Sequence, residues 1–146
     1  LLDEWLVPVC TPKLLARHGP VLTPADLKKY RLLHSTSEPW RAWSDGPTLD
    51  IEWAPSGASF DDSVAVVRAA VAGQGLVLAR WSLVEHEIET GVLAVASRKI
   101  VATHRAYYFV CPPVYMNLEK VQAFQTWIKE QAKNAPRPRL IPANLL

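Results

Sequence analysis

The chain has 146 residues, of which 49% are hydrophobic and 21% are charged, and its formal net charge is +2 at pH 7. This composition is typical of one globular domain, or of one lobe of a larger protein, and excludes an intrinsically disordered chain. No apolar run reaches the about 20 residues of a membrane-spanning helix, and no secretory signal opens the chain. The net charge is too small to indicate nucleic-acid binding by itself.

The first third of the chain predicts two strands and two capped helices. Residues 6–9 are all apolar, which favours a strand buried on both faces. The Thr-Pro pair at 11–12 supplies an N-cap and a proline at the first helical position, and Gly19 is placed to end that short helix. A second Thr-Pro pair at 23–24 starts another helix in the same way. Residues 31–34 then predict a short strand.

Residues 35–57 are polar, aromatic and rich in turn-forming residues. The pattern predicts a long loop with one helical turn and a strand at 51–54. Three tryptophans lie in this region, at Trp40, Trp43 and Trp53. Packing of the loop is the simplest role for them, but aromatic side chains beside polar ones also suit the wall of a ligand site.

The most informative segment covers residues 58–79, where a strand, a capped helix, a glycine-bounded turn and a second apolar strand follow one another. This order predicts a strand–helix–strand crossover and hence a parallel sheet. The helix therefore starts at the carboxyl end of a strand, where open α/β sheets bind ligands and where free N–H groups can meet an anion. Its cap is Asp62 or Ser63, and its buried stripe is expected at Val64, Val67 and Val71.

The remaining chain predicts two helices and two strands. Ser82 and Glu85 have the spacing of a capping box for a helix over 83–91, and a short strand follows at 92–95. Residues 107–111 are aromatic and β-branched and are stopped by two prolines, which predicts the last strand. Asn117 is expected to cap the final helix, which carries an apolar stripe of Leu118, Val121, Phe124, Trp127 and Ile128.

The sequence carries no motif for catalysis, phosphate binding or metal binding. It has no glycine-rich phosphate loop, no G-x-S-x-G elbow and no paired Cys-x-x-Cys or His-x-x-x-His. Asp61 and Asp62 are neighbours on a strand that enters a helix, so their side chains point apart and do not form a catalytic pair. We therefore expect no metal, no cofactor and no enzymatic activity.

Six segments, taken in order, carry a family resemblance: residues 6–12, 32–35, 40–43, 60–63, 72–79 and 107–112. Together they resemble the effector-binding domain of LysR-type bacterial transcriptional regulators, within the branch of the glycine-cleavage activator and the β-lactamase regulator. The resemblance covers roughly residues 1–132. Each motif alone is unspecific, and their order and spacing carry the assignment.

The resemblance implies an α/β fold, namely a Rossmann-like subdomain of a type 2 periplasmic-binding-protein-like effector domain. Residues 6–111 would form the second subdomain with both hinge strands, at 6–10 and 107–111. Residues 112–133 would hold the C-terminal helix, which returns to a first subdomain that lies largely outside this chain. Residues 134–146 would be a flexible tail.

The implied function is sensing of a small polar effector in the cleft between two subdomains, in order to control DNA binding and transcription. The resemblance places Ser63 and Tyr107 at the effector, with Ser35 and Trp40 as rims by position, whereas Tyr108 should face away from the cleft. DNA contact would come only through an N-terminal winged helix-turn-helix domain outside these residues. The protein would be a cytoplasmic homodimer with no membrane partner.

Two other classes of protein stay open on the sequence alone, and the sequence upstream would separate them from a regulator. They are an extracytoplasmic solute-binding protein of the same fold and an enzyme built on it. Cys10 and Cys111 should be reduced, because each ends its own strand of an antiparallel pair; a disulfide or a redox pair is the alternative. The apolar face of the last helix should fold back on the chain or, preferably, dock on a second copy.

Overall fold

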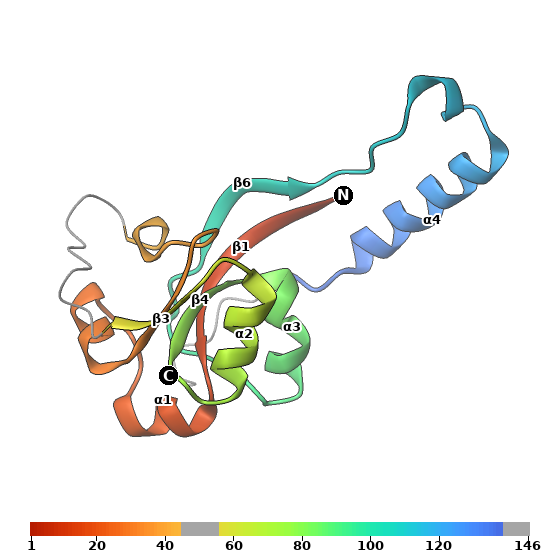
Figure 1. Ribbon diagram of the computed structural model, residues 1–146. Coiled ribbons are helices and arrows are strands. Elements are labelled where there is room, and N and C mark those ends of the chain that lie inside the picture. The colour runs from red at the N-terminus through yellow and green to blue at the C-terminus, as the bar shows by residue number, and fades with distance from the viewer. Residues whose placement is uncertain (45–55, 139–146) are drawn as a thin grey trace.

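The computed structural model describes residues 1–44 and 56–138 and shows a mixed α/β sheet with helices on both faces (Figure 1). The sheet has the strand order β3-β2-β4-β1-β5, and β6 also pairs with β1. The strands are β1 (Leu2–Cys10), β2 (Leu32–Ser35), β3 (Ser56–Phe60), β4 (Leu76–Arg80), β5 (Ala94–Val95) and β6 (Val101–Tyr107). The helices are α1 (Pro12–His18), α2 (Ser63–Val71), α3 (Trp81–Glu89) and α4 (Glu119–Asn134), with 3-10 turns η1 (Pro24–Lys29), η2 (Trp40–Ala42) and η4 (Pro113–Tyr115).

The expected crossover is confirmed. Strands β3 and β4 both run parallel to β2 and lie on either side of it, so α2 connects them across β2. Asp62 is the N-cap of α2, and its side chain accepts a hydrogen bond from the Ala65 N–H at 2.6 Å. Gly73 ends the turn with φ of 73°, a conformation that glycine adopts without strain.

The continuous apolar runs arise because both faces of the sheet are buried. Along β1, Leu6 and Cys10 face one core cluster while Val7 and Val9 face the other. The first cluster also contains side chains of η1 and η2, and the second contains those of α2 and α3. Alternation along each strand thus fills two cores from one sheet.

The two Thr-Pro pairs start helical segments where the sequence predicts them. Thr11 accepts from the Leu14 N–H at the start of α1, and Gly19 ends that helix with φ of 78°. The segment that begins at Thr23 is a 3-10 turn instead of an α-helix, with a reciprocal capping box between Thr23 and Asp26. The expected strand at 31–34 is β2, and the expected strand at 51–54 lies outside the described residues.

The expected buried stripe on α2 is wrong at two of its three positions. Val64 and Val71 are 45% and 37% exposed, whereas the buried residues of α2 are Ser63, Val66, Val67, Ala69 and Ala70. Most of this helix is apolar, so the spacing rule fits more than one face. The alanine face is the one that packs on the sheet, because small side chains allow the helix to approach it closely.

Two helix starts also differ from the expected ones. α3 begins at Trp81 without a side-chain cap, because the Ser82 hydroxyl donates to Glu4 and the Ser82 N–H donates to Glu4 Oε1 at 3.3 Å. Glu4 of β1 thus meets the donors of the first turn from another element. The last helix begins at Glu119, since Leu118 continues the preceding turn by donating to the Tyr115 carbonyl.

The last two expected strands differ in their bounds. β5 is shorter than the expected 92–95, and the strand expected at 107–111 is instead β6, which ends at Tyr107. Tyr107 lies opposite Leu2, and the pairing of β6 with β1 covers Val101 to Tyr107. Strands β1 and β6 run antiparallel, as expected for the crossing pair, and Cys10 and Cys111 are both free, as expected.

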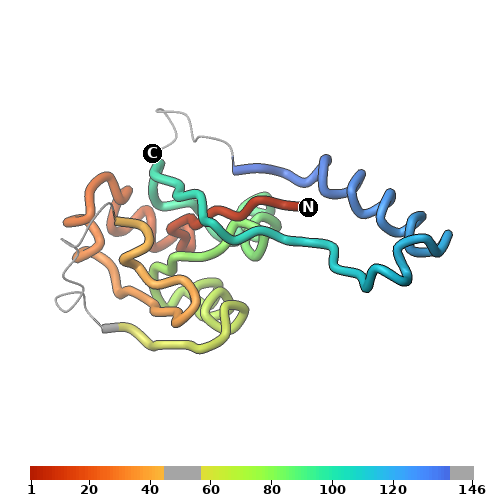
Figure 2. The backbone as a smooth tube through the Cα atoms, turned by 90° about the horizontal axis from the view of Figure 1, so that it is seen from above, coloured from red at the N-terminus to blue at the C-terminus, as the bar shows by residue number. Residues whose placement is uncertain are grey.

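Helix α4 stands away from the sheet at the end of an extended segment, as two perpendicular views show (Figures 1 and 2). None of its residues is buried, and Phe124 and Trp127 are 47% and 51% exposed. The described chain therefore does not fold this helix back over its own lobe. Its C-terminal end is tied to α3 by one hydrogen bond, from the Trp81 indole to the Pro136 carbonyl at 3.0 Å.

Candidate functional site

The candidate site lies at the carboxyl edge of the three parallel strands. Ser35 ends β2, Arg80 ends β4, and Ser63 begins the helix that follows β3. Because β3, β2 and β4 are neighbours in the sheet, these three side chains reach one end of it. A turn that follows β2 brings a fourth residue, Glu38, between them.

Glu38 is the centre of this site. Its residue exposure is 3%, and its Oε2 atom accepts hydrogen bonds from the hydroxyls of Ser35 and Ser63, both at 2.8 Å. The Ser35 oxygen also accepts from the N–H groups of Ser37 and Glu38, which fixes the turn. Burial of a carboxylate is costly unless donors surround it, and these contacts supply them.

Two arginines flank the other carboxylate oxygen. Arg80 Nε lies 3.1 Å from Glu38 Oε1, and Arg105 Nη1 of β6 lies 3.7 Å from the same atom. The Arg80 contact is an ion pair that lacks hydrogen-bond geometry. The Arg105 side chain is 54% exposed, so its guanidinium reaches solvent.

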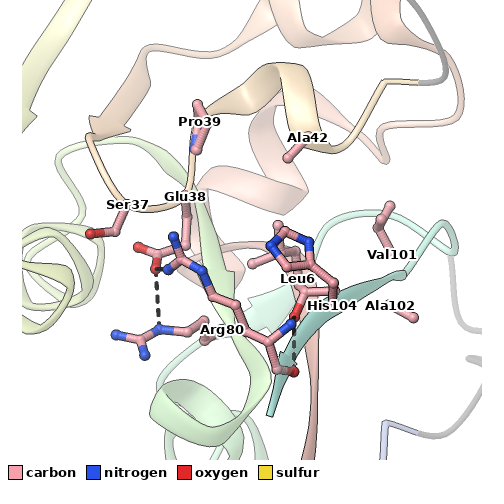
Figure 3. Close-up of a pocket in the computed structure, with 11 residues that line it drawn as sticks. Leu6, Ser37, Glu38, Pro39, Ala42, Arg80, Val101, Ala102 and His104 are labelled. Carbon is pink, nitrogen blue, oxygen red and sulfur yellow. Dashed lines mark hydrogen bonds and ion pairs between the residues drawn. The ribbon is translucent and has the colours of Figure 1, made fainter.

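A cavity of about 300 Å³ opens beside this cluster (Figure 3). This volume is at the lower end of the range found for small-molecule sites. Its wall combines the charged groups with apolar side chains from β1, η2 and β6. The lining residues are Leu6, Ser37, Glu38, Pro39, Ala42, Arg80, Val101, Ala102, Thr103, His104 and Arg105.

Tyr107 lies in a second hollow that adjoins the first. Both hollows include Arg80, His104 and Arg105 in their walls. The Tyr107 hydroxyl is 2.9 Å from Ser82 Oγ, which in turn donates to Glu4. Tyr107 therefore lines a hollow, whereas Ser35 and Ser63 are buried, line neither of these two hollows and contact the first cavity only through Glu38.

The structure corrects the expected positions of two aromatic residues. Trp40 is 1% exposed, and its indole donates to the Leu33 carbonyl at 3.0 Å, so it belongs to the core and its neighbours Pro39 and Ala42 line the cavity. Tyr108 borders the same hollow as Tyr107 instead of facing away. The strand ends at Tyr107, and the alternation of side chains does not continue beyond it.

Three residues of the site were missed in the sequence. Arg80 follows an apolar strand directly, and this position at a carboxyl edge is a usable signal. Arg105 lies far from the other site residues in the sequence, and the pairing of β6 with β1 brings it to the site. Nothing in the local sequence marks Glu38, because three of its four partners, Ser63, Arg80 and Arg105, lie far away in the sequence, in α2, β4 and β6.

The described residues show neither a metal centre nor a membrane span. Within 1–44 and 56–138, no three His, Cys, Asp or Glu side chains gather where they could hold a metal ion. None of the helices in the same residues combines the length and apolar character needed to cross a membrane.

A small cavity with charged and apolar walls at the carboxyl edge of parallel strands is typical of α/β domains that bind small ligands. Residues 1–133 match the family described as the LysR substrate binding domain, and the chain belongs to this family. The Escherichia coli glycine cleavage system transcriptional activator is 36% identical over 133 residues, which cover 90% of this chain and 44% of that protein. The Rhodobacter capsulatus transcriptional activator AmpR is 30% identical over 133 residues, with the same coverage.

Solved structures agree on the fold. The effector domain of AmpR from Pseudomonas aeruginosa superposes with a TM-score of 0.62 at 22% identity, covering 92% of this chain and 63% of that one. The regulatory domain of CrgA from Neisseria meningitidis gives 0.60 at 20% identity, covering 90% and 66%. The fold is therefore that of a periplasmic-binding-protein-like effector domain, and the chain spans about 44% of the length of the curated relatives it matches.

Proposed function

We propose that this chain is the effector-sensing part of a LysR-type transcriptional regulator and that it has no catalytic activity. The observation that carries the proposal is the family match over residues 1–133, joined to a buried polar cluster beside a small cavity. The named relatives are transcriptional regulators, which favours this function over an extracytoplasmic solute-binding protein. A cytoplasmic location follows from the same assignment.

The proposed effector is a small polar molecule that binds beside Ser35, Ser63 and Tyr107. Supporting this, both serine hydroxyls meet one buried carboxylate, and the hollow at Tyr107 shares its arginines with the main cavity. Trp40 would support the site without contacting the effector, because its indole holds the turn that carries Glu38 against β2. No cofactor is part of the proposal.

The division of the chain is also a proposal. Residues 6–111 would be the second subdomain of the effector domain, with β1 and the segment that includes Tyr107 as hinge strands. Residues 112–133 would return to the first subdomain, and 134–146 would form the tail. The long antiparallel pairing of β1 with β6 and the exposed apolar face of α4 support this division.

Binding of the effector would shift an equilibrium between an open and a closed arrangement of the two subdomains. The free energy of this shift can be no larger than the difference between the binding free energies of the effector for the two arrangements. An N-terminal winged helix-turn-helix domain of the complete protein would read the change at DNA, and the protein would act as a homodimer. The apolar stripe on α4 is a surface that a subdomain or a second copy would cover.

The function is tested in the complete protein by transcript levels of the genes that it occupies on the chromosome. Ser63→Ala and Tyr107→Phe should abolish the response to an inducing small molecule and leave DNA occupancy unchanged. The controls are Ser97→Ala, a buried serine whose hydroxyl accepts from the Lys99 N–H, and Tyr115→Phe, which is 51% exposed. A normal response in both site variants would contradict the site, and a lack of DNA occupancy by the unaltered protein would contradict the function.

A further inference from the structure

Glu38 occupies a set of donors that suits a carboxylate. Two serine hydroxyls bind one of its oxygens and two guanidinium groups flank the other. Arginine forks and hydroxyls are the groups that proteins use to recognise carboxylates. In this structure the carboxylate that these groups surround belongs to the protein itself, at Glu38.

The guanidinium groups of Arg80 and Arg105 have N–H donors that Glu38 does not use. A guanidinium has five N–H donors, and Arg105 Nη1 lies 3.7 Å from Glu38, beyond hydrogen-bond distance. Arg80 Nε faces the same oxygen without hydrogen-bond geometry. Within the described residues, no other acidic side chain forms an ion pair with either arginine.

The charges around the cavity are unbalanced in favour of an anion. Arg80 and Arg105 contribute two positive charges, and Glu38 is the one acidic residue among the described residues that line this cavity. Glu4 in the adjoining hollow is already bound by the hydroxyl and N–H of Ser82. The described lining of this cavity thus holds two guanidinium charges against one carboxylate, and the Arg105 guanidinium reaches solvent.

The rest of the wall suits a short apolar body. Leu6, Pro39, Ala42 and Val101 also line the cavity, which has a volume of about 300 Å³ (Figure 3). A cationic ligand would meet two arginines and a carboxylate whose oxygens already face four donors. An anionic head on a small apolar body matches both parts of the wall.

We propose that the cavity binds a small organic carboxylate, which competes with Glu38 for Arg80 and Arg105. This inference rests on the proposed function, because it names the chemical class of the effector. Arg105 would bind the incoming carboxylate first, since its side chain is 54% exposed. The incoming carboxylate would then replace the Glu38 side chain at the arginines, while Ser35 and Trp40 continue to hold the turn between β2 and η2.

The test is calorimetric titration of the complete protein with propionate, butyrate and benzoate. Propionamide and propylamine serve as the neutral and cationic counterparts of propionate. The carboxylates should bind and the amide and amine should not. Arg105→Gln should weaken carboxylate binding about tenfold or more, because it removes one charge-assisted contact. Glu38→Gln should strengthen binding, because it removes the competing charge and keeps an acceptor for both serines.

Arg17→Gln is the matched control, because Arg17 is an exposed arginine at the end of α1, away from the cavity. Since Glu38 is buried and its variant can fail to fold, the exposed Arg105 variant is a sufficient test by itself. Carboxylate affinity that is unchanged in Arg105→Gln, or absent in the unaltered protein, overturns the inference. A transcriptional response to the amine or the amide overturns it as well but leaves the proposed function standing, whereas transcription that no small molecule alters overturns both.

Discussion

Replacement of Trp40 by alanine separates its observed place in the core from the expected place at the rim of a ligand site. The side chain is 1% exposed, and its ring lies edge-on to Trp43 with centroids 6.4 Å apart. Truncation of a buried tryptophan costs about 3–5 kcal/mol, because apolar burial is lost and a cavity is left. For a chain of this size, a loss of 1 kcal/mol lowers the melting temperature by about 2–4 °C, so Trp40→Ala should lower it by about 10 °C.

Trp40→Phe isolates the contribution of the indole N–H. The ring stays, but the Leu33 carbonyl loses its 3.0 Å donor inside the core. An unsatisfied buried acceptor costs about 1–3 kcal/mol, so this variant should fall between the alanine variant and the unaltered chain. Replacement of Trp127 by alanine is the matched control, because that tryptophan is 51% exposed on α4.

The assay is urea unfolding of the 146-residue chain, followed by circular dichroism, with thermal unfolding as a second measurement. The expected order of stability is Trp127→Ala above Trp40→Phe, and Trp40→Phe above Trp40→Ala. A rim residue would behave differently, since its truncation would weaken ligand binding and leave the free energy of unfolding nearly unchanged. Equal stability of Trp40→Ala and Trp127→Ala would therefore refute the core assignment.

Two further predictions concern titration and thiol chemistry. Lys29, whose Nζ lies 2.6 Å from Asp26, and then Thr23 lower the pKa of the Asp26 carboxyl well below its usual range. A lowered pKa in the folded state stabilises the fold above about pH 4 and ceases to do so as the pH falls further. Urea unfolding should show that Asp26→Asn costs up to about 1 kcal/mol at neutral pH, and a difference that grows below pH 4 would contradict this. Burial raises the pKa of the Cys10 thiol to about 11, so iodoacetamide should label the partly exposed Cys111 first, and mass spectrometry showing equal labelling would contradict the fold at β1.

The local elements of the fold could be predicted because their signals are contained in a few neighbouring residues. The caps at Thr11 and Asp62 and the turn at Gly73 each depend on contacts within one turn of helix. The crossover follows from the order of such elements, together with the strong preference for one connection of parallel strands. These local features are sufficient to predict that Ser63 lies at the carboxyl edge of the parallel strands.

The errors concern features that distant residues decide. Ser82 has the correct spacing for a capping box, but Glu4, 78 positions earlier, takes its hydroxyl. The strand expected at 107–111 has a higher β propensity than the observed β6, yet the pairing with β1 covers Val101 to Tyr107. Propensity is a weak preference, and a tertiary hydrogen-bond partner overrides it.

The candidate site shows the same limit more sharply. The serine and arginine residues at the carboxyl edge could be inferred once a parallel crossover was recognised, because parallel strands end together. Arg105 could not, since β6 is antiparallel to β1 and its register shifts between Asp3 and Trp5. A shift of one residue would turn the side chain of Arg105 to the other face of the sheet, and no pattern in the sequence specifies it. One of the two guanidinium groups at the cavity therefore comes from a strand pairing whose register the sequence does not specify, and it can be placed only from the structure.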